Sequence, residues 1–500
     1  MIGAVGYKVI TLNRNQKELL QTMNTFTKKS LHVALAGLGT LAMAGAADAV
    51  MVNPNGLGQV LVYPYYTVRS PAGAGVANYN TLLSIVNTTT SQKAVKVRFR
   101  EGKASKEVLD FNVFLTPRDM WTAAVEPDGS GGAQIETTDK TCTIPSFSSG
   151  VPVAFRTGAY EGDGVKDDSV DRLTEGYFEV FEMATYAASD PLSIGAKHSG
   201  GVPKSCAAVT DAAAQIAPLP PNGGLFGGAT LINVLTGDAF TEDATALIEF
   251  TTVASYFDTG SANPNWTQTN PAIGAAVTAS GSIVSGVFAT GTLDPEKAST
   301  MALQKQSVNN EFVGELSTLS GTDWVLTFPT KHQFVDETSF TPPFSSKLDK
   351  TGSCDGASLS TWDREETPVT PGGPDFSPSP TPSGFALCWE SNIISFKSTV
   401  GSGIANVLGS GNSYTVSTGF TNGWAQLTYA STAINVASAG VIYDPTFLSG
   451  PTGTSTTFSG LPTIGFAVQT FVNGTLTDSG GHLIQSSYGG NFGHRYTGPQ

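Results

Sequence analysis

The stretch Val95–Arg100, with the sequence VKVRFR, decides the fold class because apolar and basic residues alternate strictly along it. A short polar, glycine-containing segment follows, and a second alternating stretch, Leu109–Leu115 (LDFNVFL), comes after it. Since alternate side chains of a strand point to opposite faces, the two stretches predict an antiparallel hairpin. One face of this hairpin is expected to be core. On the other face, Asp110 is expected to pair across the strands with Arg98 or Arg100.

Strand-like stretches continue along the chain, with few helical patterns between them. The clearest are 59–63, 81–86, 176–183, 230–235, 324–328, 393–396, 424–429 and 463–472. Two short helices are expected, over 207–216 and 294–305, the second with Pro295 in its first turn. We therefore predict a mainly β protein, built of antiparallel β-sandwich domains with a few short helices.

The domain organisation follows from the same patterns. Residues 50–125 are predicted to form a β-sandwich unit, 126–350 a β-rich middle region with short helices, and 351–500 a β-rich C-terminal region. Charged residues make up 14% of the chain, against about 25% in ordinary soluble domains. Gly, Ser and Thr take their place, and this composition suits many strands joined by turns.

The N-terminal residues carry the pattern of a secretory signal peptide. Lys28–Lys29 precede an apolar stretch over 31–43, and Ala47–Ala49 then provide a small-residue cleavage site. The apolar stretch is shorter than the about 20 residues that a spanning helix needs, and a buried core helix is the alternative interpretation. We predict that residues 1–49 comprise an upstream segment and a signal peptide starting near Met23, with cleavage near 49/50. The mature protein is then expected at the cell surface, in the extracellular space or in the periplasm.

The formal net charge of -14 at pH 7 bears on the expected partners. Nucleic acids and anionic membranes repel an acidic surface, so neither is an expected partner. Divalent cations are attracted to such a surface, and calcium is the cofactor that the composition favours. Beyond the signal peptide no apolar stretch reaches transmembrane length, so no transmembrane segment is expected.

Four cysteines, Cys142, Cys206, Cys354 and Cys388, lie beyond the predicted cleavage site. In an exported chain they predict two disulfides, and we favour the sequential pairs Cys142–Cys206 and Cys354–Cys388 over the two crossed connectivities. Metal ligation is the alternative, but the C-x-x-C spacing typical of it is absent. The proline-rich segment 367–383 lies inside the second predicted pair. It is therefore expected to be a tethered surface loop instead of a domain linker.

Several blocks of the chain resemble a family of uncharacterised exported proteins from Gram-negative bacteria. These blocks are 58–66, 95–121, 175–183, 460–466 and 488–494. They bracket most of the mature chain, so the resemblance runs from end to end. It implies export from a Gram-negative cell and carries no assigned activity, so no functional residue is transferred from it.

Recognisable motifs of catalysis and cofactor binding are absent from the sequence. It contains no G-x-S-x-G nucleophile elbow, no phosphate-binding glycine loop and no H-E-x-x-H zinc motif. The histidines after the signal peptide are scattered. Carboxylates are so frequent that a pair close in space is neither predicted nor excluded.

The acidic segment 161–175 is a candidate calcium site. Carboxylates spaced by glycines can wrap a hard cation, although this segment matches neither the twelve-residue calcium loop nor the glycine-rich nonapeptide repeat. A solvated acidic loop is the alternative interpretation. The candidate ligands are Asp163, Asp167, Asp168, Asp171 and Glu175.

Two further features are candidates for binding. One face of the 95–100 strand is basic and can hold an acidic glycan, or it is a solvated face that guards the strand; its residues are Lys96, Arg98 and Arg100. Several aromatic side chains can stack on sugars or form subunit contacts, or they pack in the core and at its rim. They are Tyr63, Tyr65, Tyr66, Trp121 and Trp389.

Three classes of function compete. The leading one is an exported, non-catalytic structural or interaction protein of the cell surface or extracellular layer, with self-assembly or cell-envelope components as its partners. The second is a glycan- or envelope-binding module, and the third is a secreted hydrolase with a carboxylate site. The low charge and the abundance of Thr, Gly and Ser favour the first, because they suit an extended β surface.

Overall fold

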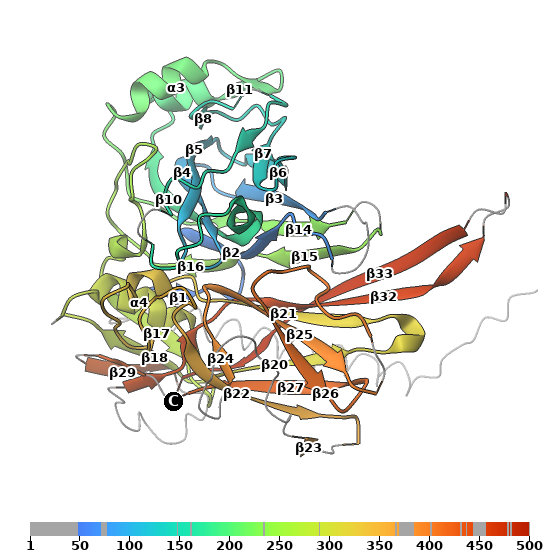
Figure 1. The fold of residues 1–500 in the computed structure, drawn as a ribbon. Helices are drawn as coiled ribbons and strands as arrows, with labels where there is room; N and C mark the ends of the chain where they lie inside the picture. The colour runs from blue at the N-terminus through green and yellow to red at the C-terminus, as the bar shows by residue number, and fades with distance from the viewer. Residues whose placement is uncertain are drawn as a thin grey trace, which may run out of the picture. The chain divides into compact units, whose positions relative to one another are not determined.

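A computed structural model of the 500-residue chain reveals the architecture (Figure 1). The structure describes residues 49–71, 78–147, 149–160, 163–233, 236–289, 291–365, 368–369, 385–400, 403–430, 433–436, 438–443, 457–477, 480 and 483–499. Strands account for 47% and helices for 10%, which confirms the predicted mainly β fold. The predicted signal peptide falls almost entirely outside the described residues.

Two sheets stack face to face to form the N-terminal sandwich (Figure 1). The first sheet has the order β1 (Met51–Val52), β16 (Thr245–Ile248), β2 (Val60–Thr67), β10 (Glu175–Tyr186), β4 (Gln92–Glu101), β5 (Glu107–Leu115) and β8 (Thr143–Ile144). The second has the order β15 (Ala239–Asp243), β14 (Gly228–Ile232), β3 (Asn80–Asn87), β6 (Met120–Pro127), β7 (Ala133–Glu136) and β9 (Val153–Ala154), with β13 (Leu225–Phe226) also on β3. Val97 and Val180 of the first sheet share a buried core with Ile85 and Trp121 of the second.

The predicted hairpin is present as β4 and β5, with Val97 opposite Phe111. On its other side β4 pairs with β10, which in turn pairs with β2. Strands from 50–125 are thus interleaved with β10, β14 and β16, which come from the 126–350 region. The chain therefore does not divide into separate structural units near residue 125, as was predicted. Alternation of apolar and polar residues identifies a strand, but it does not identify the strand with which it pairs.

A bulge lets β10 run between β2 and β4. The register between β2 and β10 shifts between Gly176 and Phe178, beside Pro64 of β2, and proline is tolerated inside a sheet at such irregular positions. Gly176 is required here because a Cβ atom would lie 2.0 Å from the carbonyl oxygen of Arg100.

The first sheet is buried on both of its faces. The face that does not meet the second sheet packs against α4 (Asp294–Leu303), η2 (Trp266–Gln268) and a small sheet of β17 (Ile273–Val277), β18 (Ile283–Val287) and β29 (Ser438–Tyr443). Val62 and Phe181 contribute to this core together with Trp266 and Met301. Every residue of β4 and β10 is therefore buried.

The C-terminal sandwich also consists of two sheets. The third sheet has the order β23 (Pro368–Val369), β22 (Asp355–Trp362), β27 (Asn422–Tyr429), β20 (Ser307–Val313) and β34 (Arg495–Thr497), with β24 (Phe385–Leu387) also on β22. The fourth has the order β26 (Ser413–Thr418), β25 (Ser391–Ser398), β21 (Gly321–Thr327), β32 (Phe466–Thr477) and β33 (Leu483–Gly493). Phe312 and Leu427 of the third sheet share a core with Trp324 and Phe396 of the fourth. The parallel pairing of β25 with β26 is an exception to the predicted antiparallel arrangement.

An apolar cluster joins the two sandwiches. Tyr65 and Leu231 of the N-terminal sandwich are buried together with Val325, Ile393 and Phe466 of the C-terminal one. The hairpin of β32 and β33 continues beyond this cluster, since its strands pair with each other as far as Thr477 and Leu483 (Figure 1).

The predicted helices over 207–216 and 294–305 correspond to α3 (Cys206–Ala213) and α4. The remaining elements are α2 (Pro191–Ala196), η1 (Val170–Thr174), η3 (Leu316–Thr318), η4 (Lys331–Gln333), β11 (His198–Ser199), β12 (Val202–Pro203), β19 (Gln304–Lys305), β31 (Leu461–Pro462), β28 (Ala433–Asn435) and β30 (Thr457–Ser459). Within the described ranges, no helix combines the length and the apolar character needed to cross a membrane.

Both predicted disulfides are present. Cys142–Cys206 links the chain just before β8 to the start of α3, and Cys354–Cys388 links the chain just before β22 to the chain just after β24. The proline-rich segment 367–383 falls inside the second loop, and apart from β23 it lies outside the described residues.

Replacing Cys142 and Cys206 together with Ala is expected to lower the free energy of unfolding by about 4 kcal/mol, because a cross-link over 64 residues restricts the unfolded chain. Urea denaturation without reductant measures the loss. The matched variant Cys354→Ala with Cys388→Ala opens a loop of 34 residues and is expected to cost slightly less. A loss below about 1 kcal/mol in both variants would contradict a stabilising role for the disulfides.

Candidate functional site

A buried arginine anchors the acidic segment that was predicted to bind calcium. Nη2 of Arg172, in η1, lies 2.9 Å from Oε1 of Glu101 and 2.5 Å from Oδ2 of Asp163. The guanidinium group is 4.0 Å from the centre of the Tyr160 ring. Glu101, at the end of β4, also accepts backbone N–H groups of the turn Lys103–Lys106. Arg172 therefore joins the acidic segment to the turn of the β4–β5 hairpin.

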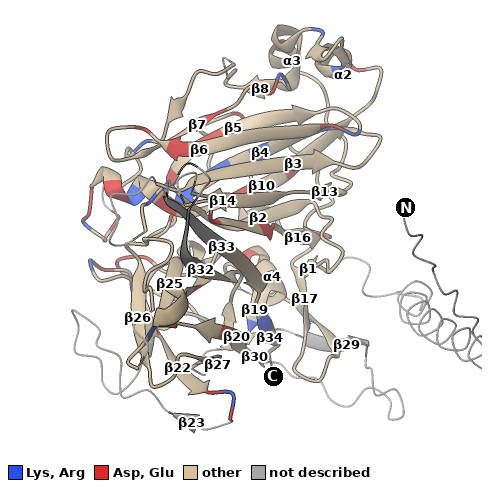
Figure 2. Ribbon diagram, turned by 90° about the vertical axis from the view of Figure 1, so that its right-hand side faces the viewer, with Lys and Arg blue, Asp and Glu red and all other residues tan. Residues whose placement is uncertain are grey.

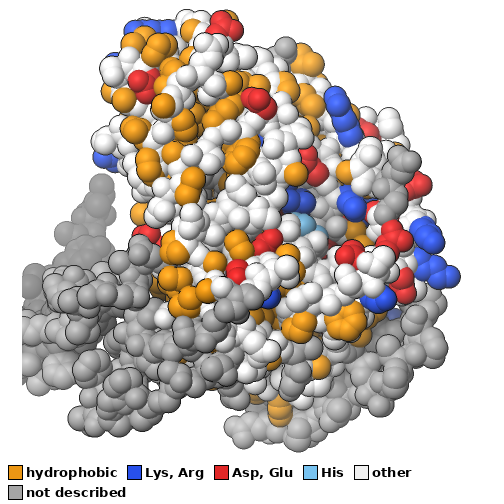
Figure 3. All heavy atoms as spheres, turned by 90° about the vertical axis from the view of Figure 1, so that its left-hand side faces the viewer, with side chains coloured by type: hydrophobic (Ala, Val, Ile, Leu, Met, Phe, Trp, Pro, Cys, Tyr) orange, Lys and Arg blue, Asp and Glu red, His pale blue; other side chains and the backbone are white. Residues whose placement is uncertain are grey.

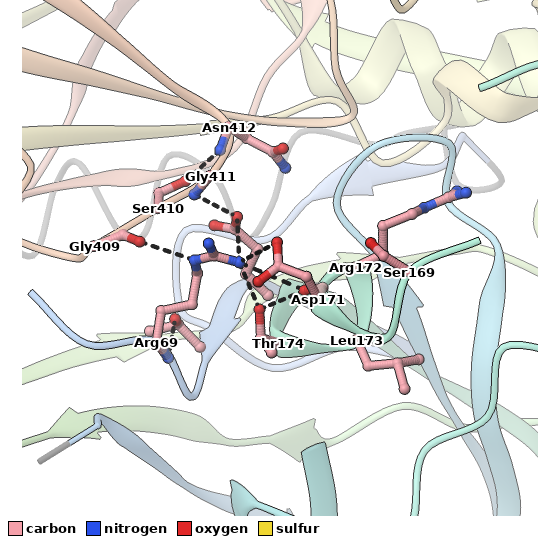
Figure 4. A network of polar contacts seen from close by, with 12 residues as sticks. Arg69, Ser169, Asp171, Arg172, Leu173, Thr174, Gly409, Ser410, Gly411 and Asn412 are labelled. Carbon is pink, nitrogen blue, oxygen red and sulfur yellow. Dashed lines mark hydrogen bonds and ion pairs between the residues drawn. The ribbon is translucent and has the colours of Figure 1, made fainter. Parts of the chain in front are cut away.

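A second arginine joins the same segment to the C-terminal sandwich (Figure 4). Nη1 of Arg69 lies 2.9 Å from Oδ2 of Asp171, and its Nε donates to the carbonyl oxygen of Gly409 at 2.8 Å. Oε1 of Glu175 accepts the backbone N–H of Gly411 at 2.8 Å. The loop 409–411 lies between β25 and β26, so these contacts connect the two sandwiches.

The other two candidate ligands differ in their surroundings. Oδ2 of Asp167 lies 2.7 Å from Nζ of Lys103. Partial burial raises the pKa of Asp167, but hydrogen bonds from Lys103 and Ser169 outweigh this and lower the pKa to about 2. Asp168 is exposed.

Four of the five predicted ligands are thus engaged by donors of the protein itself. In the part of the chain that the structure describes, no group of three or more His, Cys, Asp and Glu residues is placed to hold a metal ion. Residues 161–162 of the acidic segment lie outside that part. Calcium binding at this segment stays a prediction.

The basic face of β4 is buried and ion-paired, so the prediction of an exposed basic face is wrong. The ion pairs are Lys96–Asp110 at 2.8 Å, Arg98–Glu107 at 2.5 Å and Arg100–Glu179 at 2.8 Å. Asp110 lies opposite Arg98 in the ladder but pairs with Lys96, and not with Arg98 or Arg100 as predicted. The carbonyl oxygens of Asp258, Ser261 and Pro264 accept hydrogen bonds from Lys96 and Arg98 and so cover this face. Alternation in the sequence shows that a strand has two different faces. It does not show which of these faces is covered by segments that come later in the chain.

The aromatic side chains that were candidates for binding pack in the core or at the rim of the core. This is the alternative interpretation given above for these residues. Tyr63 is buried and stacks on Phe178 with ring centres 4.0 Å apart. Tyr66 and Trp121 belong to the core of the N-terminal sandwich. Tyr65 is also buried, and its hydroxyl donates to Glu175 at 2.6 Å. Trp389 is partly buried, with Nζ of Lys103 5.5 Å from the centre of its ring.

Polar side chains of the types used in catalysis meet beneath the β4–β5 turn. Oγ of Ser105 is 2.8 Å from the hydroxyl of Tyr177, which lies 3.5 Å from Nδ1 of His332. Burial lowers the pKa of His332 well below its usual range. Burial also raises the pKa of Glu390 to about 8, although Lys331 opposes this shift. Ser105, Tyr177 and Glu390 are buried and His332 is half-buried, and the cluster packs the turn against the C-terminal sandwich.

A hollow of about 530 Å³ lies beside β5 and contains two carboxylates. Glu107 and Asp110 line it together with Phe111, Phe147 and Arg156. Burial raises the pKa of Glu107, the direction needed for a general acid. Each carboxylate is nevertheless ion-paired with a basic residue of β4, and this pairing accounts for its position.

The outer face of the second sheet exposes apolar side chains in a row. Val86 of β3 lies opposite Met120 of β6 on one side and opposite Phe226 of β13 on the other. Leu82 follows on the same face of β3. The exposed fractions are 43% for Leu82, 51% for Met120 and 41% for Phe226.

This face is also hollowed and poor in charge. Small side chains of its strands line a hollow of about 480 Å³, among them Ser84, Thr122, Ala124, Gly228 and Thr230. The described strands of the second sheet contain no Lys or Arg, and their carboxylates, Glu126, Glu136, Glu242 and Asp243, lie at or next to strand ends (Figure 2). Glu126 and Glu136 also line the hollow. On the opposite side of the molecule, acidic and basic side chains are both present at the surface (Figure 3).

Sequence reasoning missed an aromatic pair on the outer face of the third sheet, in which Trp424 is exposed and Trp362 is half-buried. Trp424 of β27 stacks on Trp362 of β22, with ring centres 4.2 Å apart and an angle of 12° between the rings. A signal was available, because Trp424 shares the polar phase of its strand with Gln426 and Thr428. The intervening residues of β27 are buried, so this phase faces outward.

Comparisons with known proteins identify no relative. No family model and no curated protein matches the chain. Among solved structures, a human norovirus GI.7 virus-like particle aligns with 89% of this chain and 81% of its own at 11% identity. The TM-score is 0.11, so this alignment carries no argument about fold or function.

Removing the Arg172 guanidinium would leave the buried carboxylates of Glu101 and Asp163 without their positively charged partner. Arg172→Ala is therefore expected to lower the free energy of unfolding by about 3–5 kcal/mol, measured in urea. The control Arg156→Ala removes an exposed arginine and is expected to change stability by at most about 0.5 kcal/mol. Equal losses in the two variants would contradict the anchoring role of Arg172.

Stability is expected to fall as the pH rises from about 4.5 to about 8 because of Glu390. The carboxyl group ionises near pH 4.5 in the unfolded chain but stays protonated up to about pH 8 in the folded protein. The neutral variant Glu390→Gln removes this effect, so its stability relative to wild type is expected to increase by about 4 kcal/mol across that window. Urea unfolding at several pH values tests this, and parallel pH profiles for the two proteins would count against it.

Proposed function

We propose that this chain is an exported, non-catalytic structural or interaction protein of the cell surface or extracellular layer. We further propose that it contacts neighbouring copies or cell-envelope components through the outer face of the second sheet. The observation that carries this proposal is the set of exposed apolar side chains Leu82, Met120 and Phe226 on that face, with half-buried Val86 between Met120 and Phe226.

Surface energetics support a contact role for this face. Burying apolar surface contributes about 25 cal/mol per Å², and exposed apolar side chains that gather in one place mark interaction sites more often than single ones do. The hollow beside Leu82 offers a complementary surface a place to insert a side chain. The missing lysines and arginines matter too, because edge and surface lysines are a common means of preventing association.

The two disulfides support a location outside the cytoplasm, since such bonds persist in oxidising compartments. They are consistent with the signal-peptide pattern of the N-terminal residues. The proposal of surface or extracellular placement rests on these two features together.

The strongly negative charge of the chain suggests how copies associate. With a net charge of -14, neighbouring copies repel one another unless cations or an uncharged contact surface offset the repulsion. Glu126 and Glu136 line the hollow on the outer face of the second sheet, so a contact there requires cations or a basic partner surface to offset these two carboxylates.

Placing charge on the proposed contact face is expected to abolish association. The double variant Leu82→Lys with Met120→Lys should fold, because both side chains are already largely exposed. The wild-type protein is expected in the cell-exterior fraction as an ordered assembly, and the variant as a free monomer. Cell fractionation, sedimentation and electron microscopy provide the measurements.

A matched control is Val400→Lys, which adds the same charge at a side chain that is 69% exposed in the C-terminal sandwich. This variant is expected to assemble as the wild type does. The proposal is wrong if wild type stays monomeric with calcium present, is found only free in the medium, and turns over a glycan or an ester.

A further inference from the structure

The stacked tryptophan pair lies on the outer face of the third sheet, away from the contact face proposed above, with Trp424 exposed and Trp362 half-buried. Trp362 and Trp424 are direct neighbours on β22 and β27, and Glu311 of β20 completes their row across the sheet. Trp424 is 40% exposed although it is among the largest apolar side chains. Exposing so much of an indole ring to water is unfavourable, so a partner that covers it gains free energy.

The stacking holds the exposed ring in one orientation. Face-to-face contact at 4.2 Å with a 12° angle between the planes restricts both indoles. Stacked aromatic pairs contribute about 0.5–1.5 kcal/mol beyond the area that they bury. A ligand that packs on Trp424 therefore meets a pre-ordered surface and loses little free energy to ordering it.

Uncharged polar side chains form the next row on the same face. Ser360, Gln426 and Asn309 lie directly opposite one another on β22, β27 and β20. Nε2 of Gln426 donates to Oδ1 of Asn309 at 2.9 Å, which fixes the orientation of both amides. Each amide retains hydrogen-bonding capacity beyond this bond, because a carboxamide offers two donors and an acceptor with two lone pairs.

A third row extends the polar surface. Ser358 and Thr428 are opposite one another on β22 and β27, whereas Ser307, which follows on β20, is buried. Exposed Arg495 of β34 lies opposite Asn309 at the edge of the sheet. The face thus combines one flat apolar platform with hydroxyl and amide groups at strand spacings, over three adjacent strands.

We propose that this face binds a neutral polysaccharide, with a sugar ring packed on Trp424 and neighbouring hydroxyl groups bonded to Gln426 and Asn309. A pyranose ring has an apolar face of C–H groups and a rim of hydroxyls, which matches an indole beside planar amides. An extended polymer suits an open sheet face, whereas a single small molecule is usually enclosed in a pocket.

Charge selects the class of polysaccharide. The face carries one carboxylate, Glu311, and one guanidinium, Arg495, so it has no excess of positive charge to attract an acidic polymer. The negative charge of the whole chain opposes anionic polymers as well. The inference goes beyond the proposed assembly function, and because the two faces belong to different sheets, each can fail in experiment without the other.

Affinity electrophoresis of the mature protein tests the inference, in native gels that contain hydroxyethylcellulose, galactomannan or dextran. Wild type is expected to be retarded by at least one of these neutral polymers. Trp424→Ala is expected to weaken the apparent affinity about tenfold, the effect of losing one well-packed ring contact. Gln426→Ala is expected to weaken it as well, and Trp424→Phe is expected to restore part of the retardation.

Phe340→Ala is the matched control, because it removes an aromatic side chain of similar exposure, 45%, from the segment before β22, outside both proposed faces. It should be retarded as wild type is, and urea melts should confirm that all variants are folded. Quenching of tryptophan fluorescence by the same polymer, absent in Trp424→Ala, gives a second readout. The inference is overturned if none of the three polymers retards wild type, if Trp424→Ala is retarded equally, or if only alginate, an anionic polymer, binds.

Discussion

The need to neutralise charges inside the first sheet determines much of the remaining structure. β4 carries Lys93, Lys96, Arg98 and Arg100, and all four are buried because both faces of the sheet are covered. An unpaired charge in such a position costs several kcal/mol, so each of these side chains requires a carboxylate close by. The partners are Glu182 for Lys93, Asp110 for Lys96, Glu107 for Arg98 and Glu179 for Arg100. They come from β5 and β10, the two strands between which β4 lies.

The same requirement organises the contact between the sandwiches. Glu101 is the last residue of β4 and is buried. Arg172 forms ion pairs with both Glu101 and Asp163 and so neutralises their charges. The segment that contains Arg172 continues into Glu175, which is bonded to the loop 409–411. Arg69 and Gly409 are 340 positions apart in the sequence, yet the Arg69 side chain bonds the Gly409 carbonyl directly. A polar interface of this kind requires specific partners at specific positions, whereas the apolar contacts beside it tolerate more variation.

The two sandwiches leave different surfaces for partners. The first sheet is covered on both faces, and Val325, Ile393 and Phe466 of the fourth sheet are buried against the N-terminal sandwich. The outer faces of the second and third sheets present exposed apolar side chains. One displays Leu82, Met120 and Phe226 beside a hollow, and the other displays an indole platform beside amides. The first suits a dry contact with another protein surface, and the second suits a hydrated ligand with many hydroxyl groups.

Local patterns in the sequence were sufficient for the strands, the two helices, the mainly β class and the cysteine pairing. Alternation along 95–100 and 109–115 defines strands because side chains of a strand point to alternate faces, and this property needs no tertiary information. The tertiary structure alone decided which strands pair, since β10 enters the first sheet between β2 and β4 from more than 70 positions along the chain. It also decided that Lys96, Arg98 and Arg100 are buried. Whether a strand face meets water depends on segments such as 258–264 that cover it from elsewhere, and periodicity contains no information about them.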